Sequence, residues 1–179
     1  MRIIGGKFKG KVLRAPAKLP VRPTTDQAKE GLFNILRNRY YLDELRTLEL
    51  FAGTGNVSYE FASAGVEDLT VVDRHPGCVR FMGETFRSLG VKARVVKSEA
   101  EKYVRRAEGK WDIVFMDPPY GMAGLGELVE LILGKGLLAE DGILIVEHPV
   151  QENYRGVDGW AEERKYGSSM FTFFETQMD

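Results

Sequence analysis

The fold is decided by residues 48–56, which read LELFAGTGN. A short apolar run is followed at once by a Gly-x-Gly turn, and a segment of helical period begins at Val57. Glycines at such a turn allow positive φ angles and let a ligand approach the backbone without meeting a Cβ atom. The stretch therefore predicts a strand, a ligand-binding turn and a helix.

Beyond this unit, short runs rich in Val, Ile and Leu alternate with segments of helical period. We expect strands at Thr47–Leu50, Leu69–Val72, Arg94–Lys97, Asp112–Met116 and Ile143–Glu147, with helices at Val57–Ala64, Pro76–Leu89, Glu101–Ala107 and Gly126–Leu133. Such alternation is typical of an α/β, Rossmann-like fold with a mainly parallel sheet. An antiparallel C-terminal hairpin is predicted from Glu162–Tyr166 and Met170–Thr176, joined by the turn Gly167-Ser168-Ser169.

The first 45 residues differ from this pattern. Arg2–Ile4 and Lys7–Leu13 flank Gly5-Gly6, which predicts a small basic hairpin or ribbon. Asp26 is expected to cap a helix that runs to about Arg39 and has an apolar face of Ala28, Leu32, Ile35 and Leu36. We expect one domain, in which residues 1–45 are a basic extension and residues 46–179 form the Rossmann-like core.

Length and charge limit the classes of function. A chain of 179 residues that is 44% hydrophobic can bury one substantial core. The net charge is only -1, but Met1–Arg46 holds eleven basic and four acidic residues, or +7, against -8 for the remainder. The first 22 residues contain seven basic side chains and no acidic one, which favours a local site for a polyanion.

Composition also indicates the compartment. The single cysteine, Cys78, excludes an intrachain disulfide, and no apolar run approaches the roughly eighteen residues that span a bilayer. Met1–Lys11 carries charges where a signal peptide needs an apolar core. Neither His75 nor His148 has a partner at metal-ligand spacing. We therefore expect a cytoplasmic monomer without a metal site or a membrane-spanning segment.

An acidic side chain ends the second predicted strand, eighteen residues after the Gly-x-Gly turn. At this position Asp73 can accept hydrogen bonds from both ribose hydroxyls of a nucleoside. Ser58 stands where a dinucleotide site usually has a third glycine, and Glu49 could hold an amino group, so S-adenosylmethionine is favoured over NAD. The expected cofactor contacts are Glu49, Phe51, Ala52, Gly53, Thr54, Gly55, Asp73, Arg74, Glu99 and Ala100.

Glu99 has two interpretations. It could reach the adenine amine while Ala100 supplies a backbone donor, or it could be an acid favoured by the dipole at a helix N-terminus. The sequence leaves both open.

The fourth predicted strand is followed by Asp117-Pro118-Pro119-Tyr120. The exocyclic amine of a nucleobase is a poor nucleophile, because its lone pair is delocalised into the ring. The Asp117 carboxylate and the Pro118 carbonyl can each accept one N–H and orient that lone pair, and the ring of Tyr120 can stack on an extruded base. These four residues therefore form a candidate catalytic loop. The alternative is a proline-rich turn that only closes a sheet edge.

The chain resembles the class I S-adenosylmethionine-dependent methyltransferases that carry Asn or Asp before Pro-Pro-Tyr. More narrowly, it is similar to bacterial 16S rRNA guanine-N2 methyltransferases of the RsmD type in MRIIGGK at 1–7, RPTTD at 22–26, KEGLFNIL at 29–36, FAGTG at 51–55 and DPPY at 117–120. The resemblance implies the class I methyltransferase fold. It also implies methyl transfer to the N2 amine of one guanine in 16S rRNA, presented on the small ribosomal subunit or its precursor.

If the substrate is RNA, we expect the basic N-terminal element to share a face with Asp117. The expected RNA contacts are Arg2, Lys7, Lys9, Lys11, Arg22 and Thr24. The alternative is a solvated edge ribbon on which lysines prevent aggregation. We also expect Arg22–Asp26 to fold over the cofactor. An adenine-N6 methyltransferase acting on DNA or RNA, and a non-catalytic RNA-binding assembly factor, remain alternative functions.

Overall fold

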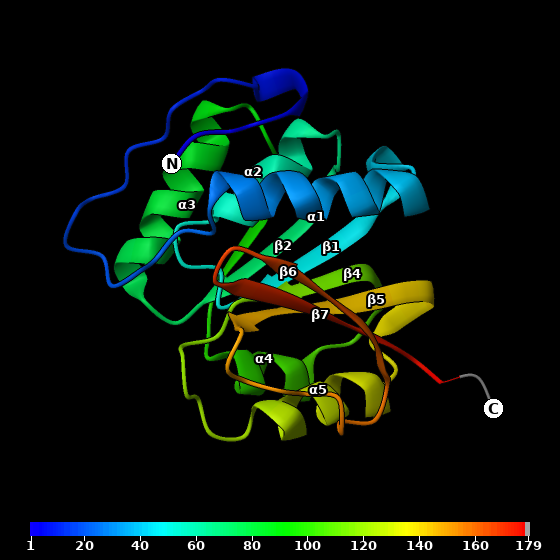
Figure 1. Ribbon diagram of the computed structural model, residues 1–179. Helices are drawn as coiled ribbons and strands as arrows, with labels where there is room; N and C mark the ends of the chain where they lie inside the picture. Colours follow the sequence, from blue (N-terminus) through cyan, green and yellow to red (C-terminus); the bar gives the residue numbers. More distant parts are fainter. Residues whose placement is uncertain (178–179) are drawn as a thin grey trace.

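The computed structural model describes residues 1–177, within which seven strands form one sheet in the order β3-β2-β1-β4-β5-β7-β6. The strands are β1 (Arg46–Leu50), β2 (Asp68–Asp73), β3 (Arg94–Lys97), β4 (Trp111–Met116), β5 (Leu138–Pro149), β6 (Trp160–Tyr166) and β7 (Ser169–Glu175). The helices are α1 (Asp26–Arg39), α2 (Asn56–Ser63), α3 (Pro76–Ser88), α4 (Ala100–Arg106) and α5 (Leu125–Gly134), with short 3-10 turns at Gly6–Phe8 and Leu42–Glu44. Helices α1, α2 and α3 cover one face of the sheet, and α4 and α5 cover the other (Figure 1).

The predicted fold class is confirmed. Strands β1 to β5 pair in parallel, and β7 runs antiparallel between β5 and β6. Because both faces of the parallel part are covered, its strands are apolar on both sides. On β4, Ile113 and Phe115 join the core under α1, α2 and α3, whereas Val114 and Met116 join the core under α4 and α5.

Strand β5 begins at Leu138, five residues before the predicted start. Leu138 pairs with Trp111 and Ile143 with Ile113, so the register shifts between these pairs. Asp141 at the irregularity has a φ of 61°, and it is followed by Gly142. Residues of this kind normally indicate a turn, which is why the sequence placed the strand start too late.

The N-terminal ribbon (residues 1–13) is antiparallel, as predicted, but its turn is longer than predicted. Arg2 and Val12 form an isolated bridge, and the reversal includes the predicted Gly5-Gly6 and continues through the 3-10 turn Gly6–Phe8. Gly6 has a φ of 74°, and a Cβ there would lie 2.0 Å from the carbonyl oxygen of Ser63. Packing against α2 therefore determines the shape of the turn, and this contact cannot be predicted from the local sequence.

The predicted cap of helix α1 was also wrong by one residue. Thr25 is the N-cap, and its hydroxyl oxygen accepts a hydrogen bond of 3.2 Å from the amide of Ala28. Asp26 is instead the first helical residue, where its charge is favourable to the helix dipole and its carboxylate pairs with Arg2 at 2.8 Å.

Candidate active site

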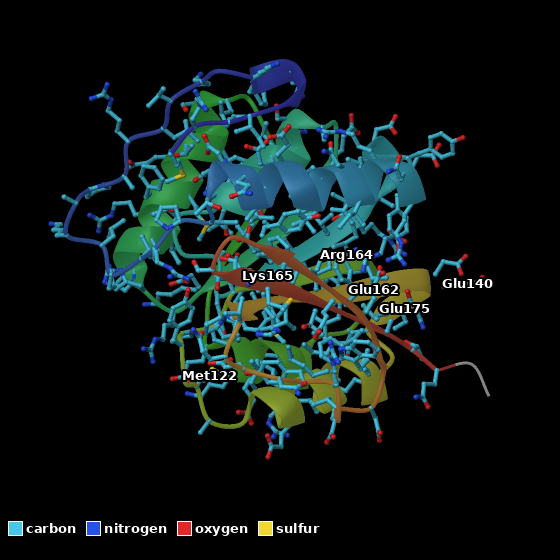
Figure 2. All side chains as sticks on the ribbon, in the orientation of Figure 1. Met122, Glu140, Glu162, Arg164, Lys165 and Glu175 are labelled. Carbon is cyan, nitrogen blue, oxygen red and sulfur yellow. The ribbon has the colours of Figure 1, made fainter. Side chains whose placement is uncertain are left out.

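A cavity of about 750 Å³ lies at the carboxyl ends of the parallel strands. In open α/β sheets, ligands bind at this edge. The loops after β1, β2, β3 and β4 supply most of its wall, and Met122 lines it from the segment that leads to α5 (Figure 2). The predicted site residues along the wall are Glu49, Phe51, Ala52, Gly53, Thr54, Asp73, Arg74, Glu99, Ala100, Asp117, Pro118, Pro119 and Tyr120.

The turn after β1 is held in an unusual backbone conformation. Phe51, Gly53 and Gly55 have φ angles of 53°, 57° and 84°. A positive φ at a bulky residue such as Phe51 costs on the order of 1 kcal/mol and is found mainly at functional sites. Gly55, although a predicted cofactor contact, is not among the residues that line the cavity, and a Cβ there would lie 3.0 Å from the ring of Tyr59. Gly55 therefore permits the tight packing of the turn on α2.

Glu49 is buried at the base of the cavity. Its Oε2 accepts hydrogen bonds from the amide of Ser58, at 2.9 Å, and from the Ser58 hydroxyl, so the carboxyl group supports the first turn of α2. Burial raises the pKa of Glu49 to about 8; the charges of Asp73 and Glu147 add to this, and the bonds from Ser58 oppose it. A cation next to this group would favour its carboxylate form.

Asp73 connects the ends of β1 and β2. Its Oδ2 accepts a hydrogen bond from the amide of Gly53 and its Oδ1 accepts one from the amide of His75, both at 2.8 Å. Each carboxylate oxygen has a second acceptor site, so Asp73 can still receive hydroxyl groups from the cavity. The sequence predicted the position of Asp73 but not its role in holding the glycine turn.

Glu99 is the N-cap residue of α4 and lines the cavity, so the structure is consistent with both of its interpretations. Its side chain is 55% exposed and lies 3.5 Å from the ammonium group of Lys102. Ala100, the first residue of α4, is buried and also lines the cavity.

Asp117 follows the last residue of β4 and reaches the cavity wall. Burial raises the pKa of Asp117 to about 8; the charge of Glu147 is the next cause, and the Arg22 guanidinium opposes both. The loop is fixed farther along, where the Gly121 amide donates to Oε1 of Glu152 at 3.1 Å. The Asp117 carboxyl group therefore gains or loses its proton near neutral pH.

Residues 20–24, which precede α1 and which we call the strap, form part of the cavity wall. The guanidinium carbon of Arg22 lies 4.1 Å from the centre of the Tyr120 ring, which is 50% exposed. The Thr24 hydroxyl donates to Oε2 of Glu147 at 2.7 Å. Of the segment Arg22–Asp26, which was expected to fold over the cofactor, residues 22–24 line the cavity, whereas Thr25 and Asp26 begin α1. Thr24 differs from the prediction of an RNA contact, because it is buried and its hydroxyl is bonded within the protein.

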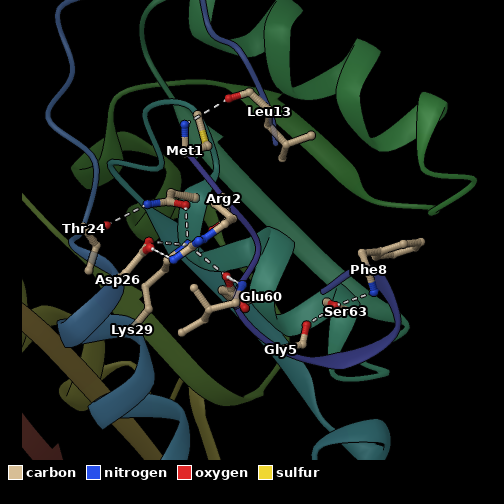
Figure 3. Close-up of polar contacts among 12 residues, drawn as sticks. Met1, Arg2, Gly5, Phe8, Leu13, Thr24, Asp26, Lys29, Glu60 and Ser63 are labelled. Atoms are coloured by element: carbon tan, nitrogen blue, oxygen red, sulfur yellow. Dashed lines mark hydrogen bonds and ion pairs between the residues drawn. The ribbon is translucent and has the colours of Figure 1, made fainter. Parts of the chain in front are cut away.

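A buried polar cluster fastens the strap and the ribbon to α2 (Figure 3). The fully buried ammonium group of Lys29 donates to the carbonyl oxygen of Arg2 at 2.6 Å, to Oδ1 of Asn56 at 3.0 Å and to Oε1 of Glu60 at 2.9 Å. Asn56 in turn donates to the Thr24 carbonyl at 2.9 Å. This cluster was not predicted from the sequence. A signal was present, since Lys29 is a charged residue at helical spacing from Leu32, Phe33 and Leu36.

Of the residues predicted to contact RNA, the five basic ones are exposed and Thr24 is buried. They do not all lie beside the cavity. Arg2 is near it through the Lys29 cluster, whereas the amide of Phe8 donates to the hydroxyl of Ser63 at the far end of α2. Lys7 and Lys9 flank Phe8 and so lie toward that end of α2, whereas Lys11 adjoins Val12, the bridge partner of Arg2.

Neither histidine is arranged for metal binding. His75 caps α3, accepting a hydrogen bond from the Gly77 amide at 3.0 Å, and His148 is bonded to the Thr172 hydroxyl at 2.7 Å. Across residues 1–177, no cluster of three or more His, Cys, Asp or Glu side chains is placed to hold a metal ion. In the same residues, no helix has the length and apolarity to cross a membrane.

Comparison with known proteins extends over nearly the whole chain. The family described as Conserved hypothetical protein 95 matches residues 1–175. The ribosomal RNA small subunit methyltransferase D of Escherichia coli K12 is 30% identical over 167 residues, covering 92% of this chain and 83% of that protein. The Bacillus subtilis protein YlbH is 37% identical over 153 residues, covering 83% of this chain and 82% of its own length.

Solved structures agree with this match. A Thermus thermophilus protein, TTHA0928, superposes with a TM-score of 0.86 at 35% identity, covering 98% of this chain and 99% of that one. A Thermus thermophilus 16S rRNA N2 G1207 methyltransferase, solved with AdoMet and guanosine, has a TM-score of 0.68 at 18% identity and covers 89% of this chain and 45% of its own, which supports the fold alone. Because the family model matches nearly the whole chain and the E. coli relative is 30% identical, the chain belongs to the RsmD family of S-adenosylmethionine-dependent small-subunit rRNA methyltransferases.

Proposed function

We propose that this protein transfers a methyl group from S-adenosylmethionine to the exocyclic N2 amine of a guanine in 16S rRNA. Family membership supports the class of reaction. The observation that carries the proposal is that one cavity is lined by both the glycine turn with Asp73 and the loop that begins at Asp117. A methyl donor and an amine acceptor held by these two loops would meet inside that cavity.

The cavity residues fit the chemical groups of S-adenosylmethionine, which supplies an electrophilic methyl group on a sulfonium. Asp73 has acceptor sites for ribose hydroxyls, and Glu99 with Ala100 would hold the adenine. Glu49 would hold the ammonium group, because both hydrogen bonds from Ser58 fall on Oε2 and leave Oε1 for a ligand. A cationic ligand also relieves the cost of a buried carboxylate.

The catalytic loop acts on the amine. The Asp117 carboxylate and the Pro118 carbonyl each accept one N–H, which directs the nitrogen lone pair at the methyl carbon. Holding nitrogen and carbon about 3 to 3.5 Å apart is the largest expected contribution to rate. As the N–C bond forms and the C–S bond breaks, the amine loses a proton to Asp117 or to water. A carboxyl group with a pKa of about 8 suits this transfer.

The aromatic ring of Tyr120 is proposed to stack on the guanine, an interaction of about 1 to 3 kcal/mol. Arg22 already covers one face of this ring at 4.1 Å, and stacked planes lie about 3.5 Å apart, so no base fits between them. A base that stacks on this face must therefore displace Arg22, whose guanidinium is then free to meet an RNA phosphate.

The partner in this proposal is 16S rRNA within the small subunit or its precursor, which places the protein in the cytoplasm. The exposed basic residues Arg2, Lys7, Lys9 and Lys11 would contact phosphates. We take the monomer as the active unit, because one chain supplies the residues that line the cavity.

The proposal is tested by methyl transfer to small subunits from a strain that lacks the enzyme. Subunits are incubated with the protein and labelled S-adenosylmethionine, and the rRNA is digested to nucleosides. Label in N2-methylguanosine supports the proposal. Label in N6-methyladenosine would make the protein an adenine methyltransferase, and binding to subunits without any label would make it an assembly factor.

A further inference from the structure

Three carboxyl groups stand on one face of the sheet, at the carboxyl ends of three neighbouring strands. Glu49 of β1 pairs with Phe115 of β4, and Phe115 pairs with Ile145 of β5. Alternate residues of a strand point to the same face, so Asp117 and Glu147, two residues farther on, share that face. Because Met116 pairs with Val146, Asp117 and Glu147 are next to each other across the β4/β5 ladder, where strands lie about 4.8 Å apart.

Glu147 has no part in the chemistry described so far. It is only 2% exposed and lies behind Asp117 rather than among the residues that line the cavity. Its partners are the neutral hydroxyls of Thr24, from the strap, and Ser169, from β7. A buried carboxyl group with only neutral partners destabilises a fold relative to an apolar side chain. Its presence beside the catalytic loop therefore indicates a functional role.

The charges around Asp117 come from three directions. Glu147 on β5 and Glu49 on β1 raise its pKa, and Arg22 on the strap lowers it, in addition to the effect of burial. Burial also raises the pKa of Glu147, which the bonds from Thr24 and Ser169 and the charge of Arg22 oppose. Helix α1 carries one further buried cation, Lys29, but its ammonium group donates hydrogen bonds to Glu60 and Asn56. After burial, Glu147 thus has the largest effect on the pKa of Asp117.

We propose that Glu147 is a positioning residue of the methyl-transfer reaction, which sets the charge of Asp117 and anchors the strap beside it through Thr24. The proposal rests on the proposed function only for its consequence in catalysis. As a second carboxyl group beside Asp117 on the same face of the sheet, Glu147 favours the protonated form of Asp117, so that the Asp117 carboxyl group is able to take a proton from the amine near neutral pH. Glu147 acts through Asp117 and does not touch the substrate.

The test is the replacement Glu147→Gln, which keeps the shape of the side chain and removes its ability to ionise. The titration midpoint of the Asp117 side chain is measured by ¹³C NMR of the carboxyl carbon in the full chain, without RNA, and the signal is assigned by its loss in Asp117→Asn. We expect the midpoint to fall by about one pH unit or more. The acid limb of the pH profile for methyl transfer should move to lower pH by the same amount.

Two variants separate charge from packing. Glu147→Asp keeps a carboxyl group, so the titration midpoint of Asp117 should stay close to the wild-type value. Glu140→Gln makes the same chemical change on an exposed residue at the opposite end of β5, far from the loop that holds Met122, and should leave the midpoint unchanged (Figure 2).

The proposal is overturned if folded Glu147→Gln has the wild-type midpoint, or if Glu140→Gln shifts it as much as Glu147→Gln does. If Glu147→Gln does not fold, a wild-type midpoint in a folded Glu147→Ser variant overturns the proposal and a lowered one supports it. The titration needs neither RNA nor methyl transfer. Failure of the proposed function would appear separately, as wild-type protein that makes no N2-methylguanosine.

Discussion

Asp117 is the residue on which the chemistry depends most. In Asp117→Ala the amine loses its main acceptor, while the cofactor turn is untouched. We expect methyl transfer to fall by about 10²-fold or more, as for other positioned proton acceptors, and the affinity for S-adenosylhomocysteine to stay near that of the wild type. Single-turnover kinetics and calorimetry measure the two quantities. Wild-type activity in this variant would refute the role assigned to Asp117.

The raised pKa of Asp117 also affects stability. In the folded protein the pKa is about 8, whereas an unfolded Asp has a pKa of about 3.9. The folded state therefore holds the extra proton between these values, and this contribution to the free energy of unfolding is lost as the pH rises toward 8. Asp117→Asn has no such term, so its stability relative to the wild type should increase from pH 5 to pH 8. Urea denaturation at several pH values measures the difference, and a constant difference would contradict the raised pKa.

Among individual residues, the sequence predicted side chains that follow strand ends within recognisable motifs, such as Asp73 and Asp117. It did not predict Glu147, although this residue ends the fifth expected strand in the same way that Asp73 ends the second. The rule that acids at the ends of parallel strands meet at one edge would have found it. The role of Thr24 could not be found, because its partner is 123 residues away in the chain.

Among the elements, helix α1 holds the ribbon and the strap in place through Lys29. In Lys29→Met the carboxylate of Glu60 stays buried without its cation, so we expect a loss of about 3 to 5 kcal/mol in the free energy of unfolding. The matched control Arg105→Met breaks an exposed pair with Glu101 on α4 and should cost less than about 0.5 kcal/mol.

Urea denaturation compares these variants. Adding Glu60→Gln to Lys29→Met removes the unpaired charge and should recover part of the loss. Equal stability of Lys29→Met and Arg105→Met would show that the buried cluster does not hold the N-terminal segment.

For the helices and strands, the alternation of apolar runs with segments of helical period was enough to predict the parallel sheet and the C-terminal hairpin. The errors lie where distant packing decides the backbone. The turn of the ribbon extends through Gly6–Phe8 because it packs on Ser63, and β5 continues through Asp141 because it pairs with Trp111. Neither contact is visible in a local window of sequence.

For the molecule as a whole, the charge asymmetry should appear in RNA binding. Each phosphate neutralised on a single strand contributes about -0.7 to the slope of log K against log salt, so replacing Lys7, Lys9 and Lys11 by Ala should make the slope less negative by about 2. A control variant with Ala at Lys110, Arg164 and Lys165, exposed on the other part of the chain, should leave the slope unchanged. Titration of labelled 16S rRNA at several salt concentrations gives the slope for each variant and for the wild type. If the triple-lysine variant has the wild-type slope, the lysines of the ribbon make no phosphate contacts.

The proposed reaction requires that the methyl donor is bound facing the loop after β4. A crystal structure of the protein with S-adenosylmethionine measures this directly. We predict ribose hydroxyls on the Asp73 carboxylate and the methyl group directed at Asp117-Pro118-Pro119-Tyr120. A donor bound outside this cavity, or one whose methyl group points away from that loop, would contradict the account.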